Sequence, residues 1–135
     1  MDAVTHTGPA QTKKTVLVVD DSMTIRLQVS SALASAGYQV SEANDGLQAL
    51  DAVRSPCKPA LILCDVNMPR MTGLEFLETF KGDQPAPPVP VIMLTTEGTP
   101  DLILRAKRAG ARGWIVKPFQ THLLLSAVRR LLGDA

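Results

Sequence analysis

The sequence predicts an α/β fold in which helices cover both faces of a doubly wound, five-stranded parallel sheet. Three apolar runs have the length of strands and are continuous rather than alternating: Val16–Val19, Ala60–Cys64 and Val91–Leu94. Continuous hydrophobicity is typical of strands buried on both faces, as in a parallel sheet. Stretches of helical periodicity separate these runs. The pattern therefore indicates a βα unit repeated five times, (βα)5, with right-handed crossovers.

Two shorter and more polar segments indicate further strands, and apolar residues spaced by three and four indicate the helices. In chain order, the strands are expected at Val16–Val19, Gln39–Ala43, Ala60–Cys64, Val91–Leu94 and Gly113–Val116. The expected helices are marked by Ile25, Val29, Ala32, Leu33 and Ala36, by Leu47, Leu50 and Val53, by Leu74, Leu77 and Phe80, and by the ranges Asp101–Ala109 and Thr121–Leu132. Gly37 and Gly110 directly follow two of these helices, as C-terminal capping glycines do.

The composition indicates one compact domain and gives no sign of a nucleic-acid or membrane partner. The chain has 135 residues, 45% of them hydrophobic, and its 14 basic and 13 acidic residues leave a net charge of +1. That balance gives no electrostatic case for nucleic acid, and no apolar run approaches the roughly 20 residues of a membrane span. Cys57 and Cys64 show neither metal-site spacing nor a disulfide pattern. We therefore expect a cytoplasmic protein with a disordered leader at residues 1–13 and one domain at residues 14–133.

Chemically active side chains stand at the ends of the predicted strands. Asp20 and Asp21 follow the first strand, Asp65 the third, Thr95 the fourth and Lys117 the fifth. The carboxyl ends of parallel strands meet at one edge of the sheet, where α/β proteins place their sites. These side chains are therefore expected in one crevice.

Three carboxylates in one crevice need a counter-charge. Two carboxylates about 4 Å apart repel each other by roughly 4 kcal/mol at an effective dielectric constant near 20. Hard carboxylate oxygens favour Mg²⁺, and an acidic metal pocket with Lys117 and the Thr95 hydroxyl is suited to holding a phosphoryl group. One of the aspartates can then act as a nucleophile and form an aspartyl phosphate.

Each of these features also has an ordinary explanation when taken alone. Asp20 and Asp21 could cap the following helix, Asp65 could be a turn residue, and Lys-Pro is a common loop dipeptide. The functional hypothesis depends on their joint occurrence at successive strand ends.

Three motifs make the chain resemble the receiver domain of two-component response regulators. They are Val18-Val19-Asp20-Asp21-Ser22, the nine residues from Asp65 to Gly73 (DVNMPRMTG), and the seven residues from Gly113 to Phe119 (GWIVKPF). The resemblance covers residues 14–132 and implies the flavodoxin-like strand order 2-1-3-4-5. It points to a CheY-like stand-alone receiver. Such a protein is a phosphorylation-activated switch rather than an enzyme, and assists its own phosphorylation and dephosphorylation.

The resemblance implies a phosphate acceptor and a Mg²⁺ site. Asp65 is expected to accept phosphate from the phosphohistidine of a histidine kinase. Asp21 and Asp65 are expected to ligate Mg²⁺ directly and Asp20 through water. Asn67 is expected to offer its backbone carbonyl.

The resemblance also implies how the phosphorylated state is recognised. Lys117 is expected to bind a phosphoryl oxygen, across a cis Lys117–Pro118 bond that only proline makes common. Thr95 is expected to reorient towards the new phosphate. Trp114 stands where the family usually has a Tyr or Phe switch ring.

The expected partners are a sensor histidine kinase and a downstream protein such as a flagellar motor component. The segment Asp21-Ser22-Met23-Thr24-Ile25-Arg26, with Asn67 and Glu97, is similar to CheY-like chemotaxis regulators. Arg112 stands where receivers that dimerise on DNA-binding regulators usually have Asp, which favours a monomer.

Three alternatives stay open. Within the family, the chain could be a phosphorelay intermediate that passes phosphate to a histidine phosphotransfer protein. A flavodoxin would bind the phosphate of FMN in the loop after the first strand, where this chain places two carboxylates. An aspartate-nucleophile phosphohydrolase usually carries Asp-x-Asp after the first strand, whereas here the two aspartates are adjacent and the presumed nucleophile follows the third.

Overall fold

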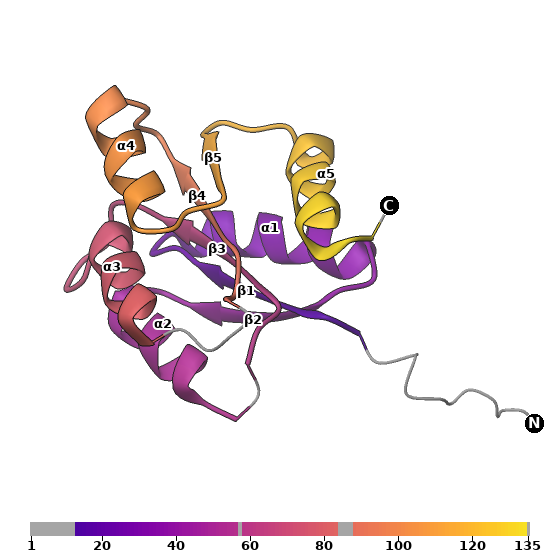
Figure 1. Ribbon diagram of the computed structural model, residues 1–135. Helices are drawn as coiled ribbons and strands as arrows, with labels where there is room; N and C mark the ends of the chain where they lie inside the picture. The colour runs from indigo at the N-terminus through magenta and orange to yellow at the C-terminus, as the bar shows by residue number, and fades with distance from the viewer. Residues whose placement is uncertain (1–12, 57, 84–87, 135) are drawn as a thin grey trace, which may run out of the picture.

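The structure, a computed structural model, describes residues 13–56, 58–83 and 88–134. Strands and helices alternate along the chain as the sequence predicts (Figure 1). The strands are β1 (Thr15–Val19), β2 (Gln39–Ala43), β3 (Leu61–Asp65), β4 (Val91–Thr95) and β5 (Gly113–Val116). The helices are α1 (Met23–Ser35), α2 (Gly46–Arg54), α3 (Gly73–Asp83), α4 (Pro100–Arg108) and α5 (Thr121–Leu132). The predicted leader falls, apart from Lys13, outside the described residues.

The five strands form one parallel sheet in the order β2-β1-β3-β4-β5, which confirms the predicted topology. In register, Val19 lies opposite Cys64, Asp65 opposite Leu94, and Thr95 opposite Val116. The carboxyl ends of the strands therefore lie along one edge of the sheet. Residues that directly follow a strand therefore lie at that edge.

Helices cover the sheet on both faces (Figure 1). Side chains of α2, α3 and α4 pack with Leu17, Ile62 and Met93 on one face. Side chains of α1 and α5 pack with alternate residues of the same strands on the other face. Every residue of β3 and β4 is buried, which explains their continuous hydrophobicity. The edge strands β2 and β5 are more exposed, which explains their weaker sequence signal.

Local capping sets the helix starts. Ser22 caps α1, with its hydroxyl accepting a hydrogen bond from the Ile25 backbone at 3.3 Å. The interpretation of Asp20 and Asp21 as caps of this helix is therefore wrong. Thr99 caps α4, which begins at Pro100. α1 is followed by Gly37 at φ +97°, the left-handed conformation that glycine adopts without strain.

Four strand boundaries differ by one residue from the sequence prediction, the first being the start of β1 at Thr15 rather than Val16. β3 runs from Leu61 to Asp65 rather than from Ala60, and β4 extends to Thr95. Asp65 and Thr95 are therefore the last residues of their strands and are held by the ladder itself. Within the described part of the chain, no helix is long and apolar enough to cross a membrane.

Candidate functional site

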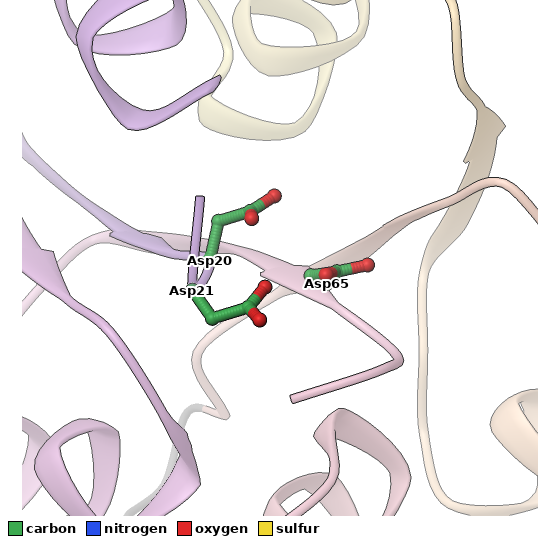
Figure 2. Close-up of side chains that lie close together, drawn as sticks. All are labelled: Asp20, Asp21 and Asp65. Carbon is green, nitrogen blue, oxygen red and sulfur yellow. The ribbon is translucent and has the colours of Figure 1, made fainter. Parts of the chain in front are cut away.

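Three carboxylates converge at the carboxyl edge of the sheet, as Figure 2 shows. Asp20 and Asp21 follow β1, and Asp65 ends β3. Carboxylate oxygens of these residues all lie within 4.8 Å of one another. Asp20 and Asp65 are buried, whereas Asp21 is exposed. Two of the three carboxylates are thus buried and the third is open to solvent, and we call this cluster the acidic pocket.

Lys117 is the cation of this pocket. Its ammonium lies 2.6 Å from Asp20 Oδ2, to which it donates a hydrogen bond, and 3.5 Å from Asp65 Oδ1. The Lys117 backbone N–H donates to the carbonyl of Thr95 at 2.7 Å, which fixes the lysine against the end of β4. The Lys117–Pro118 bond is cis, as expected. Lys117 therefore bridges the two buried carboxylates from a fixed backbone position.

The electrostatics of the pocket favour a divalent cation. Three carboxylates and one ammonium leave a formal charge of −2 when all are ionised. Burial, reinforced by the negative charge of Asp20, raises the pKa of Asp65 to about 6 despite the opposing effect of Lys117. Carboxylate oxygens are the ligands that Mg²⁺ prefers. The donor set fits such an ion, and Asp20, Asp21 and Asp65 would hold it.

The chain directly after Asp65 is tightly folded around the carboxylate. The Val66 N–H donates to Asp65 Oδ1 at 2.8 Å. The Gly73 N–H donates to the Val66 carbonyl at 2.8 Å, which closes the β3–α3 loop. A Cβ at position 73 would lie 1.9 Å from the Asp65 carbonyl oxygen, so only glycine fits there. This loop therefore fixes the orientation of the Asp65 side chain.

Glu97 connects the remaining predicted site residues on the β4 side of the pocket. Its backbone N–H donates to Thr95 Oγ1 at 3.1 Å, and its carbonyl accepts a hydrogen bond from Trp114 Nε1 at 3.2 Å. Its carboxylate accepts a hydrogen bond from the Asn67 side-chain amide. Thr95 is fully buried, and Trp114 is half-buried. One residue thus contacts the acceptor loop and both predicted switch residues.

The structure brings together most of the predicted site. Asp20, Asp21, Asp65 and Lys117 form the pocket, and Thr95 ends the adjacent strand. The side chains of Asn67 and Trp114 both form hydrogen bonds with Glu97. An ion pair between Asp45 and Arg70 has no signature in the sequence, because its partners are 25 residues apart. The sequence pattern of Asp45 followed by Gly46 and an apolar repeat is typical only of a helix N-cap.

The fold and the site thus define a class of protein: a flavodoxin-like α/β domain with an acidic pocket at the carboxyl edge of its sheet. Its sequence matches the response regulator receiver domain family over residues 16–129. The chain belongs to that family. Receivers of this kind are signalling switches rather than catalytic enzymes.

The relatives include chemotaxis proteins and a transcriptional regulator. Chemotaxis protein CheY1 of Helicobacter pylori is 35% identical over 119 residues, which cover 87% of this chain and 96% of that protein. The structure of chemotaxis protein CheY4 of Vibrio cholerae has a TM-score of 0.83 and 42% identity, covering 90% of this chain and 100% of that one. The phosphate regulon transcriptional regulatory protein PhoB of Pseudomonas aeruginosa is 38% identical over 119 residues, which cover 88% of this chain but 52% of that protein.

Proposed function

We propose that this chain is a phosphorylation-activated switch in which Asp65 accepts phosphate from a histidine kinase in the presence of Mg²⁺. The observation that carries the proposal is a buried carboxylate at a strand end, 3.5 Å from the Lys117 ammonium and within 4.8 Å of two further carboxylates. The packing of the fold does not by itself require charged side chains at these positions. Buried charges are costly unless they are paired or coordinate a metal.

The proposed reaction transfers a phosphoryl group from nitrogen to oxygen. An ionised Asp65 oxygen forms the new P–O bond while the P–N bond of the donor's phosphohistidine breaks. The bonding electron pair returns to the imidazole nitrogen, which then takes up a proton. With its pKa at about 6, Asp65 is mostly ionised at neutral pH and is ready to act as the nucleophile.

Each side chain of the pocket has a proposed role. Asp21 and Asp65 would ligate Mg²⁺ directly and Asp20 through water, with the backbone carbonyl of Asn67 as a further ligand. When bound, the metal neutralises the carboxylates and polarises the phosphoryl oxygens. Lys117 would bind a phosphoryl oxygen, which its position between Asp20 and Asp65 supports.

Thr95 and Trp114 would report the phosphate to the surface. A hydroxyl can accept one hydrogen bond and donate another, so Thr95 can donate to a phosphoryl oxygen. Moving towards the phosphate would draw its oxygen away from the Glu97 N–H, which now contacts it at 3.1 Å. Because Trp114 donates to the Glu97 carbonyl, the indole would follow. Phosphate then shifts the population between two arrangements of this segment.

We propose chemotaxis as the output, with a downstream protein such as a flagellar motor component as the target. The likeness to CheY1 and CheY4 over nearly the full length of those proteins supports it. The domain would comprise residues 14–133, act in the cytoplasm as a monomer and bind no nucleic acid. Arg112, exposed directly before β5, supports the monomer because dimerising receivers usually carry an acid there. The receiver would also assist its own dephosphorylation.

The experiment is labelling with a small phosphodonor in Mg²⁺. We expect intact-mass spectrometry to show one added phosphoryl group, which is lost in Asp65→Asn and in chelator. Asp101→Asn, which removes an exposed carboxylate from α4, should label like the wild type. Undiminished labelling of Asp65→Asn would contradict the proposal.

A second experiment identifies the output. The wild type bearing a phosphoryl mimic and Asp65→Asn are used as baits in parallel pull-downs. Selective capture of a flagellar motor protein by the wild type supports chemotaxis. Capture of a histidine phosphotransfer protein would instead support the phosphorelay alternative and contradict the chemotaxis proposal.

A further inference from the structure

An ion pair outside the pocket ties the β3–α3 loop, residues 66–72, to the start of α2. The Arg70 guanidinium donates to Asp45 Oδ2. The Asp45 side chain is only 1% exposed, and its other oxygen accepts a hydrogen bond from the Gln48 backbone at 2.9 Å. A carboxylate buried to this extent is costly unless it is paired. Arg70, whose side chain is 60% exposed, therefore supplies the charged partner of this buried carboxylate from the surface.

Two further contacts join the same segments. The Gly46 N–H donates to the Met71 carbonyl at 3.3 Å. The Met71 side chain packs directly on Gly46, where an added Cβ would lie 2.6 Å from Met71 Cγ. We call this set of contacts, made by Asp45, Gly46, Arg70 and Met71, the α2 clamp.

The clamp holds the loop in a conformation that it would not adopt without support. Arg70 has φ +67°, in the left-handed region, and it is the one non-glycine residue with positive φ in the described part of the chain. Non-glycine residues in this region are strained and persist where their surroundings fix them. Loss of the Asp45–Arg70 pair removes part of that support.

The loop transmits its position to the acceptor carboxylate. Its first residue, Val66, donates its N–H to Asp65 Oδ1 at 2.8 Å, and the Val66 carbonyl accepts from Gly73 at 2.8 Å. A change in the loop would therefore move the Val66 N–H that holds the Asp65 carboxylate. No hydrogen bond or ion pair links Arg70 to the three carboxylates among the described residues, so its effect must pass through the loop.

We propose that Asp45 and Arg70 are positioning residues that set the affinity of the acidic pocket for a divalent cation, through the α2 clamp and the β3–α3 loop. This inference rests on the proposed function of the pocket. Partners that orient metal ligands typically change metal affinity by 10–100-fold when removed. Because the clamp acts through the loop, we expect the lower end, about tenfold.

Calorimetric titration of the full chain with Mg²⁺ tests the proposal. Arg70→Met removes the charge and keeps a non-glycine residue at the positive φ, whereas Asp45→Asn removes the opposite charge and keeps an oxygen to cap α2. Both should raise the Kd for Mg²⁺ about tenfold, the lower limit for partners that orient ligands. Arg70→Lys, which keeps the charge, should retain most of the wild-type affinity for Mg²⁺.

A matched control separates positioning from general stability. Arg105→Ala breaks an exposed ion pair with Glu78 at 2.8 Å, between α4 and α3, and should leave the Kd unchanged. Circular dichroism at the titration temperature verifies that every variant is folded. If the wild type binds Mg²⁺ and both clamp variants bind it equally well, the clamp proposal is overturned while the proposed function stands. A wild type that binds no Mg²⁺ would overturn both.

Discussion

Removing the charge of Asp65 should stabilise the folded protein at neutral pH. Burial and the nearby Asp20 raise the pKa of Asp65 from 3.8 to about 6, so the folded state holds its proton more tightly than the unfolded chain does. The stabilisation from the protonated form is fully present below pH 4 and is lost as the pH rises through about 6. Each pKa unit is equivalent to about 1.4 kcal/mol, so ionised Asp65 costs the folded state about 3 kcal/mol.

Asn is uncharged and nearly isosteric with the protonated carboxyl. In chelator at pH 7.5, Asp65→Asn should therefore raise the free energy of unfolding by up to about 3 kcal/mol. At pH 4 the gain should fall to about 0.5 kcal/mol, because the folded wild type is then protonated at Asp65 and the unfolded chain is only about half ionised there. Urea denaturation at both pH values measures the difference. The m-value, which is the slope of the unfolding free energy against urea concentration, should be unchanged. Asp51→Asn on the exposed side of α2 is the matched control, with an expected change within about 0.5 kcal/mol.

Mg²⁺ should reduce the advantage of the variant. A ligand at a concentration 100 times its Kd stabilises the state that binds it by about 2.7 kcal/mol. The wild type gains this stabilisation, and Asp65→Asn, with one ligand oxygen replaced by an amide, gains less. A variant no more stable than the wild type at pH 7.5 in chelator, or a gain of equal size at pH 4, would refute the reasoning.

Two further predictions concern packing next to the site. Gly73→Ala should lower the free energy of unfolding by about 3 kcal/mol and reduce phosphoryl labelling, because its Cβ would meet the Asp65 carbonyl oxygen at 1.9 Å. Urea denaturation measures the stability and intact-mass spectrometry measures the labelling. A variant as stable as the wild type would contradict the close approach. Trp114, the only tryptophan, borders a cavity of about 70 Å³ between α4 and β5. If the indole becomes more buried when a phosphoryl mimic and Mg²⁺ bind, its emission maximum should move to shorter wavelength. Thr95→Ala should weaken that response. An unchanged spectrum with a mimic that demonstrably binds would mean that the indole is permanently packed.

Much of the fold was predictable because its signals are local. The buried strands are continuous apolar runs, and the predicted ranges of β2, β5 and α5 match the observed ones. The start of α3 also has a local signature, because Thr72 and Glu75 form a capping box with bonds of 2.9 and 3.1 Å. Boundaries moved by one residue at Ala60 and Thr95, where ladder pairing rather than composition decides the end of a strand.

The sequence also determined which side chains would form the pocket. Asp20, Asp65 and Lys117 each stand at the end of a strand, and parallel pairing places such ends at one edge whatever the details of packing. This inference needs only the class of fold. It does not need a contact between any particular pair of side chains.

Only the tertiary structure decided how those side chains behave. The raised pKa of Asp65 depends on its burial and on Asp20, and neither can be read from neighbours in the chain. The connection of Asn67 to Glu97 joins residues 30 positions apart, and the pair of Asp45 and Arg70 spans 25. Helix and strand signals arise from interactions between near neighbours, whereas desolvation and charge pairing depend on distance in space. Those distances exist only once the βα units have packed together.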